Sequence, residues 1–175
     1  MKMTDDLEKA FNEQITLEFE ASMVYRQLAI EMEIRDLPGI ASWLRHQADE
    51  EIVHANKLID HVAARGNHPI IGSINPPRAE IDSVFACFEA AGAHERRNSE
   101  AIRSLYRVAE AASDLDSRPL LSWFLAEQVE EESTLSEIAG RIRMIDDDGP
   151  GLLRLDGELG ARPVASTEST TAPGA

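Results

Sequence analysis

Cysteine is almost absent from this 175-residue chain, which contains only Cys87. A single cysteine excludes an internal disulfide framework and a cysteine-rich zinc site within one chain. Cys87 lies in the apolar run VFACF, which indicates a buried hydrophobic role rather than a nucleophile. Long apolar runs are missing too, since no stretch approaches the roughly 20 residues that cross a bilayer. The first ten residues, MKMTDDLEKA, lack the apolar segment of a secretory signal. We therefore predict a cytoplasmic protein with no membrane partner.

Basic residues are scarce as well. The chain has 17 Lys and Arg against 32 Asp and Glu, a formal net charge of -15, and a pI near 4.6. A field of that sign repels phosphate backbones and attracts cations, so we predict no nucleic-acid partner. Hydrophobic residues make up 43% and aromatic ones only 5%, a composition typical of a soluble domain that leans towards helix.

Apolar residues recur at steps of three and four over four long stretches, approximately residues 7–32, 40–62, 84–109 and 121–145. This period predicts four amphipathic helices. Asp36 with Pro38, and Ser117 with Pro119, suit the opening turns of the second and fourth helices, and Gly66 suits the end of the second. Short turns near 35–38 and 113–118 predict two antiparallel hairpins.

The segment 66–77 between the hairpins is long enough for one crossover along a bundle. We expect an all-α fold, a four-helix bundle with one long crossover and a short fifth helix near Leu152–Leu159. Residues 1–160 form the predicted domain. Residues 161–175 are rich in Ser, Thr, Ala and Pro and predict a flexible low-complexity tail.

Four glutamates interrupt the apolar stripes, one in each predicted helix: Glu18, Glu51, Glu95 and Glu131. Burying an ionised carboxylate without a partner costs several kcal/mol. Too few basic side chains share these faces to compensate. Two divalent cations would balance four carboxylates, so the stripes predict a paired metal site.

The spacing of these residues repeats between the two predicted hairpins. Glu18 lies 33 residues before Glu51, and Glu95 lies 33 residues before Gln128. Each hairpin has one further candidate ligand three residues on, at His54 and at Glu131. Residues three apart on a helix lie on one face. Adding 77 maps Glu18, Glu51 and His54 onto Glu95, Gln128 and Glu131. The hairpins are therefore expected to present matched ligand sets to one centre.

Oxygen-rich ligands with a single imidazole suit Fe(II) or Mn(II), although zinc can also bind. Glu51 is the candidate bridge between two metals about 3.5–4 Å apart. Tyr25 lies seven residues after Glu18 on the same face. Two roles stay open for it: a hydrogen bond or an electron supplied to the site, or a core aromatic with a satisfied hydroxyl.

A second acidic group, Glu50, Glu127 and Glu130, lies one step off the main stripes. It is either a set of solvated flanking charges or a third, weaker cation site. The remaining histidines are expected at the surface or in hydrogen bonds: His46, His61, His68 and His94.

The chain resembles the bacterial non-haem ferritins over roughly residues 5 to 160. The resemblance is carried by NEQITLEFEASMVYRQL, WLRHQADEEIVHANKL, HERRNSEAI and WFLAEQVEEESTL. It implies a ferritin-like fold and a ferroxidase centre that oxidises Fe(II) with dioxygen or hydrogen peroxide and stores ferric mineral. By this resemblance, the first iron is held by Glu18, Glu51 and His54. The second iron is held by Glu51, Glu95 and Glu131 with Gln128 close by, and the extra iron site is Glu50, Glu127 and Glu130.

Departures from related families narrow this expectation. Bacterioferritins carry E-x-x-H in the fourth helix, where this chain has Gln128-x-x-Glu131, and their haem-ligating methionine position is Ile52 here, so no haem is expected. A rubrerythrin adds a cysteine-rich domain that one cysteine cannot form. The resemblance also implies a homo-oligomeric shell of 24 subunits rather than a dodecamer.

Two other functions stay open. A di-iron redox enzyme, a peroxidase or an oxygenase, would retain two irons per chain and act on a separate substrate. A structural or interaction bundle would carry an inactive acidic core. The preferred oxidant, the route and electron donor of iron release, and the role of the tail are not determined by these patterns.

Overall fold

The computed structural model describes residues 1–77 and 81–162, and the secondary structure of these residues is helical. The helices are α1 (Asp5–Glu33), α2 (Pro38–Ala64), α3 (Val84–Ala111), α4 (Arg118–Ile145) and α5 (Gly149–Gly160). The predicted all-α four-helix bundle is confirmed, and α5 is longer at both ends than expected. Of the predicted tail, residues 163–175 lie outside the described part of the chain. Within that part, no helix has the length and apolar character required to span a membrane.

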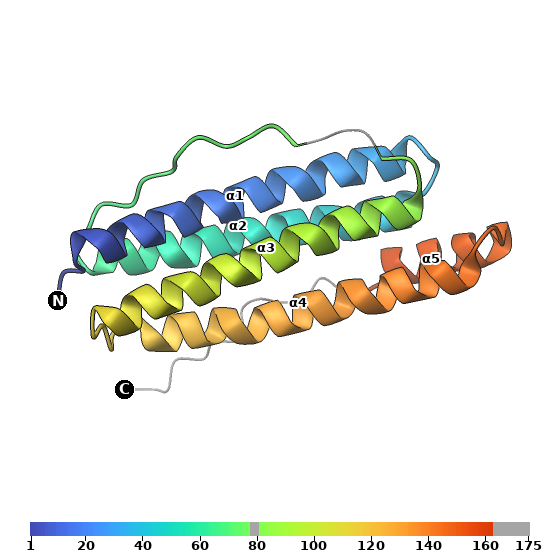
Figure 1. The fold of residues 1–175 in the computed structure, drawn as a ribbon. Helices are drawn as coiled ribbons and strands as arrows, with labels where there is room; N and C mark the ends of the chain where they lie inside the picture. Colours follow the sequence, from blue (N-terminus) through green and yellow to red (C-terminus); the bar gives the residue numbers. More distant parts are fainter. Residues whose placement is uncertain (78–80, 163–175) are drawn as a thin grey trace.

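The four long helices form two antiparallel hairpins, α1–α2 and α3–α4, joined by one crossover (Figure 1). The crossover runs the length of α1, so α3 starts at the end of the bundle where α1 stops. The α5 helix packs against the beginning of α2. There the Asp156 carboxylate accepts a hydrogen bond of 2.7 Å from the Ile40 amide and caps α2 from 116 residues away. Gly39 permits this approach, since a Cβ there would lie 2.0 Å from the Asp156 carbonyl oxygen.

The helix ends differ from expectation at two positions. Asp36 does not open α2 but ends α1 in the left-handed conformation, with φ of 59°. Its amide bonds to the Glu33 carbonyl and the next amide bonds to the Met32 carbonyl, a Schellman pattern. Ser117 does precede α4 but makes no side-chain cap. Its hydroxyl instead pairs with the His61 ring at 2.9 Å. Gly66 ends α2 as predicted, with φ of 72°.

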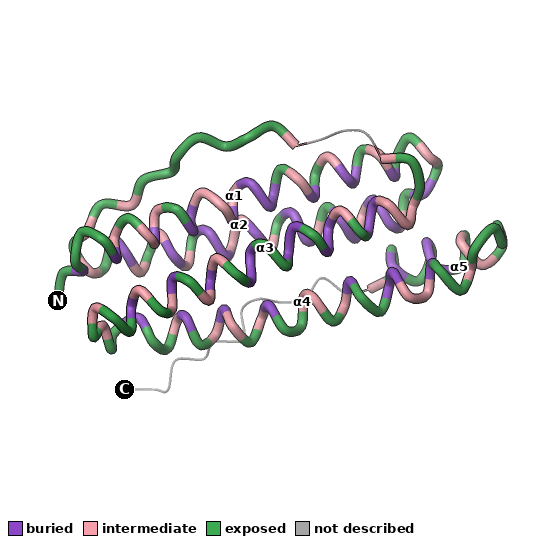
Figure 2. The backbone as a smooth tube through the Cα atoms, in the orientation of Figure 1, coloured by how far each residue is buried: buried purple, intermediate pink, exposed green. Residues whose placement is uncertain are grey.

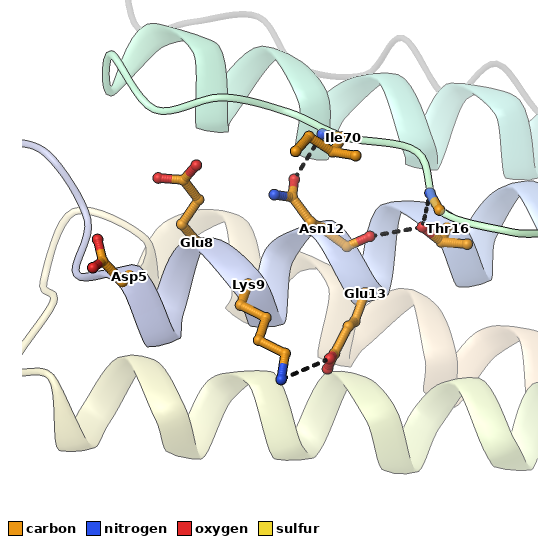
Figure 3. A pocket seen from close by; sticks show the side chains of 8 residues that line it. Asp5, Glu8, Lys9, Asn12, Glu13, Thr16 and Ile70 are labelled. Atoms are coloured by element: carbon orange, nitrogen blue, oxygen red, sulfur yellow. Dashed lines mark hydrogen bonds and ion pairs between the residues drawn. The ribbon is translucent and has the colours of Figure 1, made fainter.

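The crossover is held by polar side chains spaced four residues apart along α1, a pattern that places them on one face (Figure 3). The Ile70 amide donates to Asn12 Oδ1 at 3.0 Å, and the Gly72 amide donates to Thr16 Oγ1 at 2.8 Å. Further along, the Asn75 side chain donates to Glu20 at 3.4 Å. These bonds give partners to polar groups of the extended crossover, whose backbone has no neighbouring strand to bond to.

Two hydrophobic clusters fill the bundle, and buried residues line the facing sides of the helices (Figure 2). One cluster lies around Leu7, Phe11 and Phe124, and the other around Met32, Leu44 and Phe88. Residues 18, 51, 95 and 128 fall between the two clusters on their helices. The fold therefore places a polar layer between two apolar ones.

Candidate metal centre

The polar layer draws one side chain or more from each long helix. Glu18, Glu51 and Glu95 are 0%, 1% and 0% exposed, and His54 and Gln128 are equally inaccessible. The Glu131 side chain, expected at the same depth, is half-buried at the edge of the layer. Such burial is tolerated only where each polar atom finds a partner.

The ligand set of the first hairpin meets that condition only in part. Ligand atoms of Glu18, Glu51 and His54 all lie within 4.8 Å of one another. His54 Nδ1 is 3.5 Å from Glu51 Oε2 and 4.0 Å from Glu18 Oε2, beyond hydrogen-bond distance. Within the described part of the chain, Glu51 Oε2 and both His54 nitrogens have no hydrogen-bond partner. Two of these atoms, Glu51 Oε2 and the His54 Nδ1 that faces it, lie beside Glu18 and fit a cation, which would supply the missing partner to each.

Burial sets the protonation of this first ligand set. Desolvation lowers the pKa of His54, with a smaller opposing effect from Glu18, so the ring is neutral at pH 7. A neutral imidazole has the free lone pair that a metal requires. Desolvation, followed by the charges of Glu95 and Glu18, raises the pKa of Glu51 well above its usual value. In the absence of a cation the Glu51 carboxyl therefore retains a proton that a metal must displace.

The ligand set of the second hairpin is held by protein side chains instead. The Tyr25 hydroxyl donates to Glu95 Oε1 at 2.8 Å, and Gln128 Nε2 donates to Glu95 Oε2 at 3.0 Å. Glu131 Oε2 lies 3.5 Å from the amide of Gln47. Among the described residues, Glu51, Glu95 and Glu131 do not form a group within 4.8 Å as the first set does. Tyr25 is thus both a buried aromatic with a satisfied hydroxyl and a hydrogen-bond donor to a candidate ligand, and its supply of an electron stays a prediction.

The pKa values in the second set follow the same causes. Burial raises the pKa of Glu95 to about 7, against the hydrogen bond from Tyr25, which lowers it. Burial and then the charge of Glu95 raise the pKa of Glu131 well above its usual value. Burial also raises the pKa of Tyr25 well above 10, so its hydroxyl stays protonated and continues to donate.

Four polar residues of the layer were not singled out as site residues by sequence reasoning: Gln14, Gln47, Asn98 and Ser99. The signal that could have found them is spacing. Gln14 and Gln47 lie four residues before Glu18 and Glu51, and Asn98 and Ser99 lie three and four residues after Glu95. Polar residues at these distances share the helix face of a buried glutamate. Ser99 accepts from Gln128 at 3.3 Å and donates to the Glu132 carboxylate, which fixes the Gln128 amide.

The outer acidic group lies beside the layer without closing into a site. Burial, then the charge of Glu127, raises the pKa of Glu50 to about 7. Glu127 is half-buried and Glu130 is exposed, and these three do not form a ligand group within 4.8 Å among the described residues. Glu50 Oε2 accepts from Gln47 at 2.6 Å, so the same amide contacts the outer group and Glu131.

Aromatic side chains of α4 cover the imidazole. Trp123 and Phe124 contact the His54 ring edge-on, with centroids 5.4 and 5.6 Å away. Lys57 Nζ lies 4.8 Å from the Trp123 ring centroid. This apolar wall excludes water from one side of the candidate site.

One expectation about the remaining histidines is wrong. His94 is only 8% exposed, and neither of its ring nitrogens has a hydrogen-bond partner among residues 1–77 and 81–162. Burial lowers its pKa to about 4. It lies outside the ligand group although it precedes Glu95 in sequence, because neighbouring helix positions point about 100° apart.

Comparisons with known proteins agree with this architecture. A family profile described as a ferritin-like domain matches residues 8–145. The chain is 32% identical to a bacterial non-heme ferritin of Escherichia coli O6:H1, over 85% of this chain and 90% of that one. It is 33% identical to a bacterial non-heme ferritin of Staphylococcus epidermidis, over 91% of this chain and 96% of that one. The structure of an open-pore ferritin of Archaeoglobus fulgidus superposes with a TM-score of 0.90 at 34% identity, over 92% of this chain and 98% of that one.

Proposed function

The chain belongs to the ferritin family, which stores iron and has ferroxidase activity, and we propose that oxidation occurs in its buried polar layer. The observation that carries this proposal is the group of unpartnered atoms on Glu51 and His54 next to Glu18. In this proposal Fe(II) is the substrate, and ferric iron is the product that the protein stores.

Two iron positions share the layer. Glu18, Glu51 and His54 hold the first, and Glu51, Glu95 and Glu131 hold the second, with Glu51 as the bridge. Binding displaces protons from the Glu51 and Glu131 carboxyls, whose pKa values are raised by burial. The first position has unpartnered atoms on Glu51 and His54, whereas binding at the second exchanges hydrogen bonds of Glu95 for a cation.

The oxidation step needs two electrons at one place. Each Fe(II) supplies one, and together they reduce dioxygen to hydrogen peroxide with two protons. Hydrogen peroxide is the alternative oxidant. The residues of the chain hold the two ions together, while Trp123 and Phe124 exclude water beside His54. Tyr25 and Gln128 hold the Glu95 carboxylate in a single orientation until the cation binds.

The second position is built to release its product. Gln128 stands where the repeat has Glu51 in the first hairpin, so the side chain beside the second position is a neutral amide rather than a carboxylate. A neutral amide binds Fe(III) more weakly than a carboxylate, which favours movement of ferric iron to a mineral. Glu50, Glu127 and Glu130 are proposed as a third, weaker iron site on that route.

The remaining proposals concern the domain bounds, the oligomer and the cellular location. We propose that residues 1–160 form one ferritin domain, and that 24 copies form a hollow shell in the cytoplasm. The net charge of -15 would then attract cations to such a shell.

Aerobic loading with Fe(II) tests the function. Purified protein is titrated, separated by gel filtration, and iron and protein are measured in each fraction. Rapid oxidation with many irons per subunit in a large-particle peak is the expected result. Oxidation that ends at about two retained irons per chain would contradict storage and indicate a di-iron enzyme, and no oxidation above the buffer rate would indicate an inactive bundle.

A further inference from the structure

Both oxygens of the Glu18 carboxylate are bonded to amide side chains. Gln14 Nε2 donates to Glu18 Oε1 at 2.6 Å, and Asn98 Nδ2 donates to Glu18 Oε2 at 3.2 Å. All three side chains are 3% exposed or less, so water does not compete for these bonds. The orientation of this carboxylate is therefore set by protein before any cation binds.

The two amides also determine each other. Gln14 Nε2 donates to Asn98 Oδ1 at 2.6 Å. Because the Asn98 oxygen accepts from Gln14, its NH2 group must face Glu18. The oxygen that it holds, Glu18 Oε2, is the one that lies 4.0 Å from His54 Nδ1. The bond from Asn98 thus points the carboxylate towards the imidazole.

Asn98 belongs to α3, the other hairpin, and the arrangement is reciprocal. Tyr25 of α1 orients Glu95 of α3, and Asn98 of α3 orients Glu18 of α1. The 77-residue repeat does not account for this pair, since its counterparts are Ile102 and Ala21, neither of which has a polar side-chain atom. The ligands repeat between the hairpins, and the groups that orient them do not.

We propose that Asn98 is a positioning residue that holds Glu18 towards His54 and so sets the cation affinity of the first position. The inference rests on the proposed function, because it takes Glu18, Glu51 and His54 as ligands. Removing a hydrogen-bond partner of a metal ligand commonly costs 10- to 100-fold in metal affinity. Without Asn98 the carboxylate is free to rotate, and its ordering opposes binding.

The test is an anaerobic titration of the full-length protein with Co(II), followed by visible absorption. Asn98→Leu removes the amide at similar volume and is expected to weaken the first position by about 10-fold or more. The matched control is Ser22→Ala, because Ser22 is buried on α1 and its hydroxyl bonds to the Ala48 carbonyl, at 2.7 Å, rather than to a candidate ligand. The control is expected to bind as the parent does.

A second background separates positioning from a general loss of packing. His54→Ala lacks the first position, so adding Asn98→Leu to it should weaken the remaining Co(II) binding much less than it weakens binding in the parent. An equal loss in that background, or unchanged affinity in the single variant, would overturn the proposal. If Asn98→Leu does not fold, Gln14→Met removes the other amide and should weaken the same position. A parent protein that binds no Co(II) would refute the proposed metal centre itself.

Discussion

The two hairpins of this bundle carry the same ligand pattern but differ in what satisfies it. In the α1–α2 hairpin, Glu51 and His54 have buried atoms with no partner. In the α3–α4 hairpin, Glu95 is bonded on both oxygens by Tyr25 and Gln128. The difference indicates that a sequence repeat can specify ligand positions while the surrounding side chains give those positions different chemistry. Each set has one glutamate bonded on both oxygens, Glu18 in the first and Glu95 in the second. Among the described residues only the first, open set also keeps unpartnered ligand atoms, and the second is the closed set.

The largest effect is expected when the imidazole is removed from the open set. His54→Ala should slow Fe(II) oxidation by about 100-fold, since it removes a ligand outright rather than a supporting bond. Stopped-flow absorbance of the ferric product measures the rate, and gel filtration checks that assembly is intact. His94→Ala is the matched control, because His94 is also buried and unpartnered but lies outside the layer. Similar losses in both variants would contradict the assignment.

A change of pH should affect cation binding through the closed set. Burial raises the pKa of Glu95 to about 7, so its carboxyl is protonated at pH 5.5 and mostly ionised at pH 7.5. Displacement of this proton alone makes binding about 25-fold weaker at the lower pH, and the protons on Glu51 and Glu131 increase that ratio. Calorimetric titration with Mn(II) at both values measures the ratio.

When no cation is present, a rise in pH lowers the stability of the folded protein, whereas it strengthens cation binding. A carboxyl whose pKa is raised by folding binds protons in the folded state, so its contribution to stability is lost as pH rises from about 4.5 to 7. Excess Mn(II) should therefore raise Tm more at pH 7.5 than at pH 5.5. Glu95→Gln should reduce the pH dependence, and an undiminished one would show that other groups cause it.

Making the hairpins more alike should have a smaller effect. Gln128→Glu gives the second hairpin the carboxylate that the repeat has at Glu51. It removes the amide bonds to Glu95 and Ser99, which should cost about 1–3 kcal/mol of stability at pH 7.5 without metal. Product iron should also leave more slowly, seen as a slower rate after the first two irons per chain. Gln27→Glu, on α1 away from the layer, is the control, and equal behaviour of the two variants would reject this account of Gln128.

The smallest effect concerns the turns of the two hairpins. Both end their first helix with a non-glycine residue at positive φ, Asp36 at 59° and Ser113 at 55°. Ser113→Gly should stabilise the protein by about 0.5–1 kcal/mol, because glycine adopts this conformation without a Cβ penalty. Asp36→Gly should gain less, since aspartate tolerates the left-handed region better than serine. Thermal unfolding compares them, and a larger gain at Asp36 would contradict the argument.

Much of the site was predictable because its ligands break an apolar pattern. Glu18, Glu51 and Glu95 stand out as charges at buried positions, and the E-x-x-H spacing fixes two ligands on one face. Gln14 and Asn98 were missed because a neutral amide on a helix stripe does not signal a site by itself. The burial of His94 was missed for a related reason, since an isolated histidine has no periodic partner that reveals its surroundings.

The sequence by itself determined the helices, the hairpins and the register of the ligands, because these depend on a local period and on turn residues that act within a few positions. Only the tertiary structure decided which ligands are free and which are bonded. The bonds from Tyr25 to Glu95 and from Asn98 to Glu18 join residues 70 and 80 positions apart. Such contacts depend on how two hairpins pack across the bundle, and no local pattern encodes that distance.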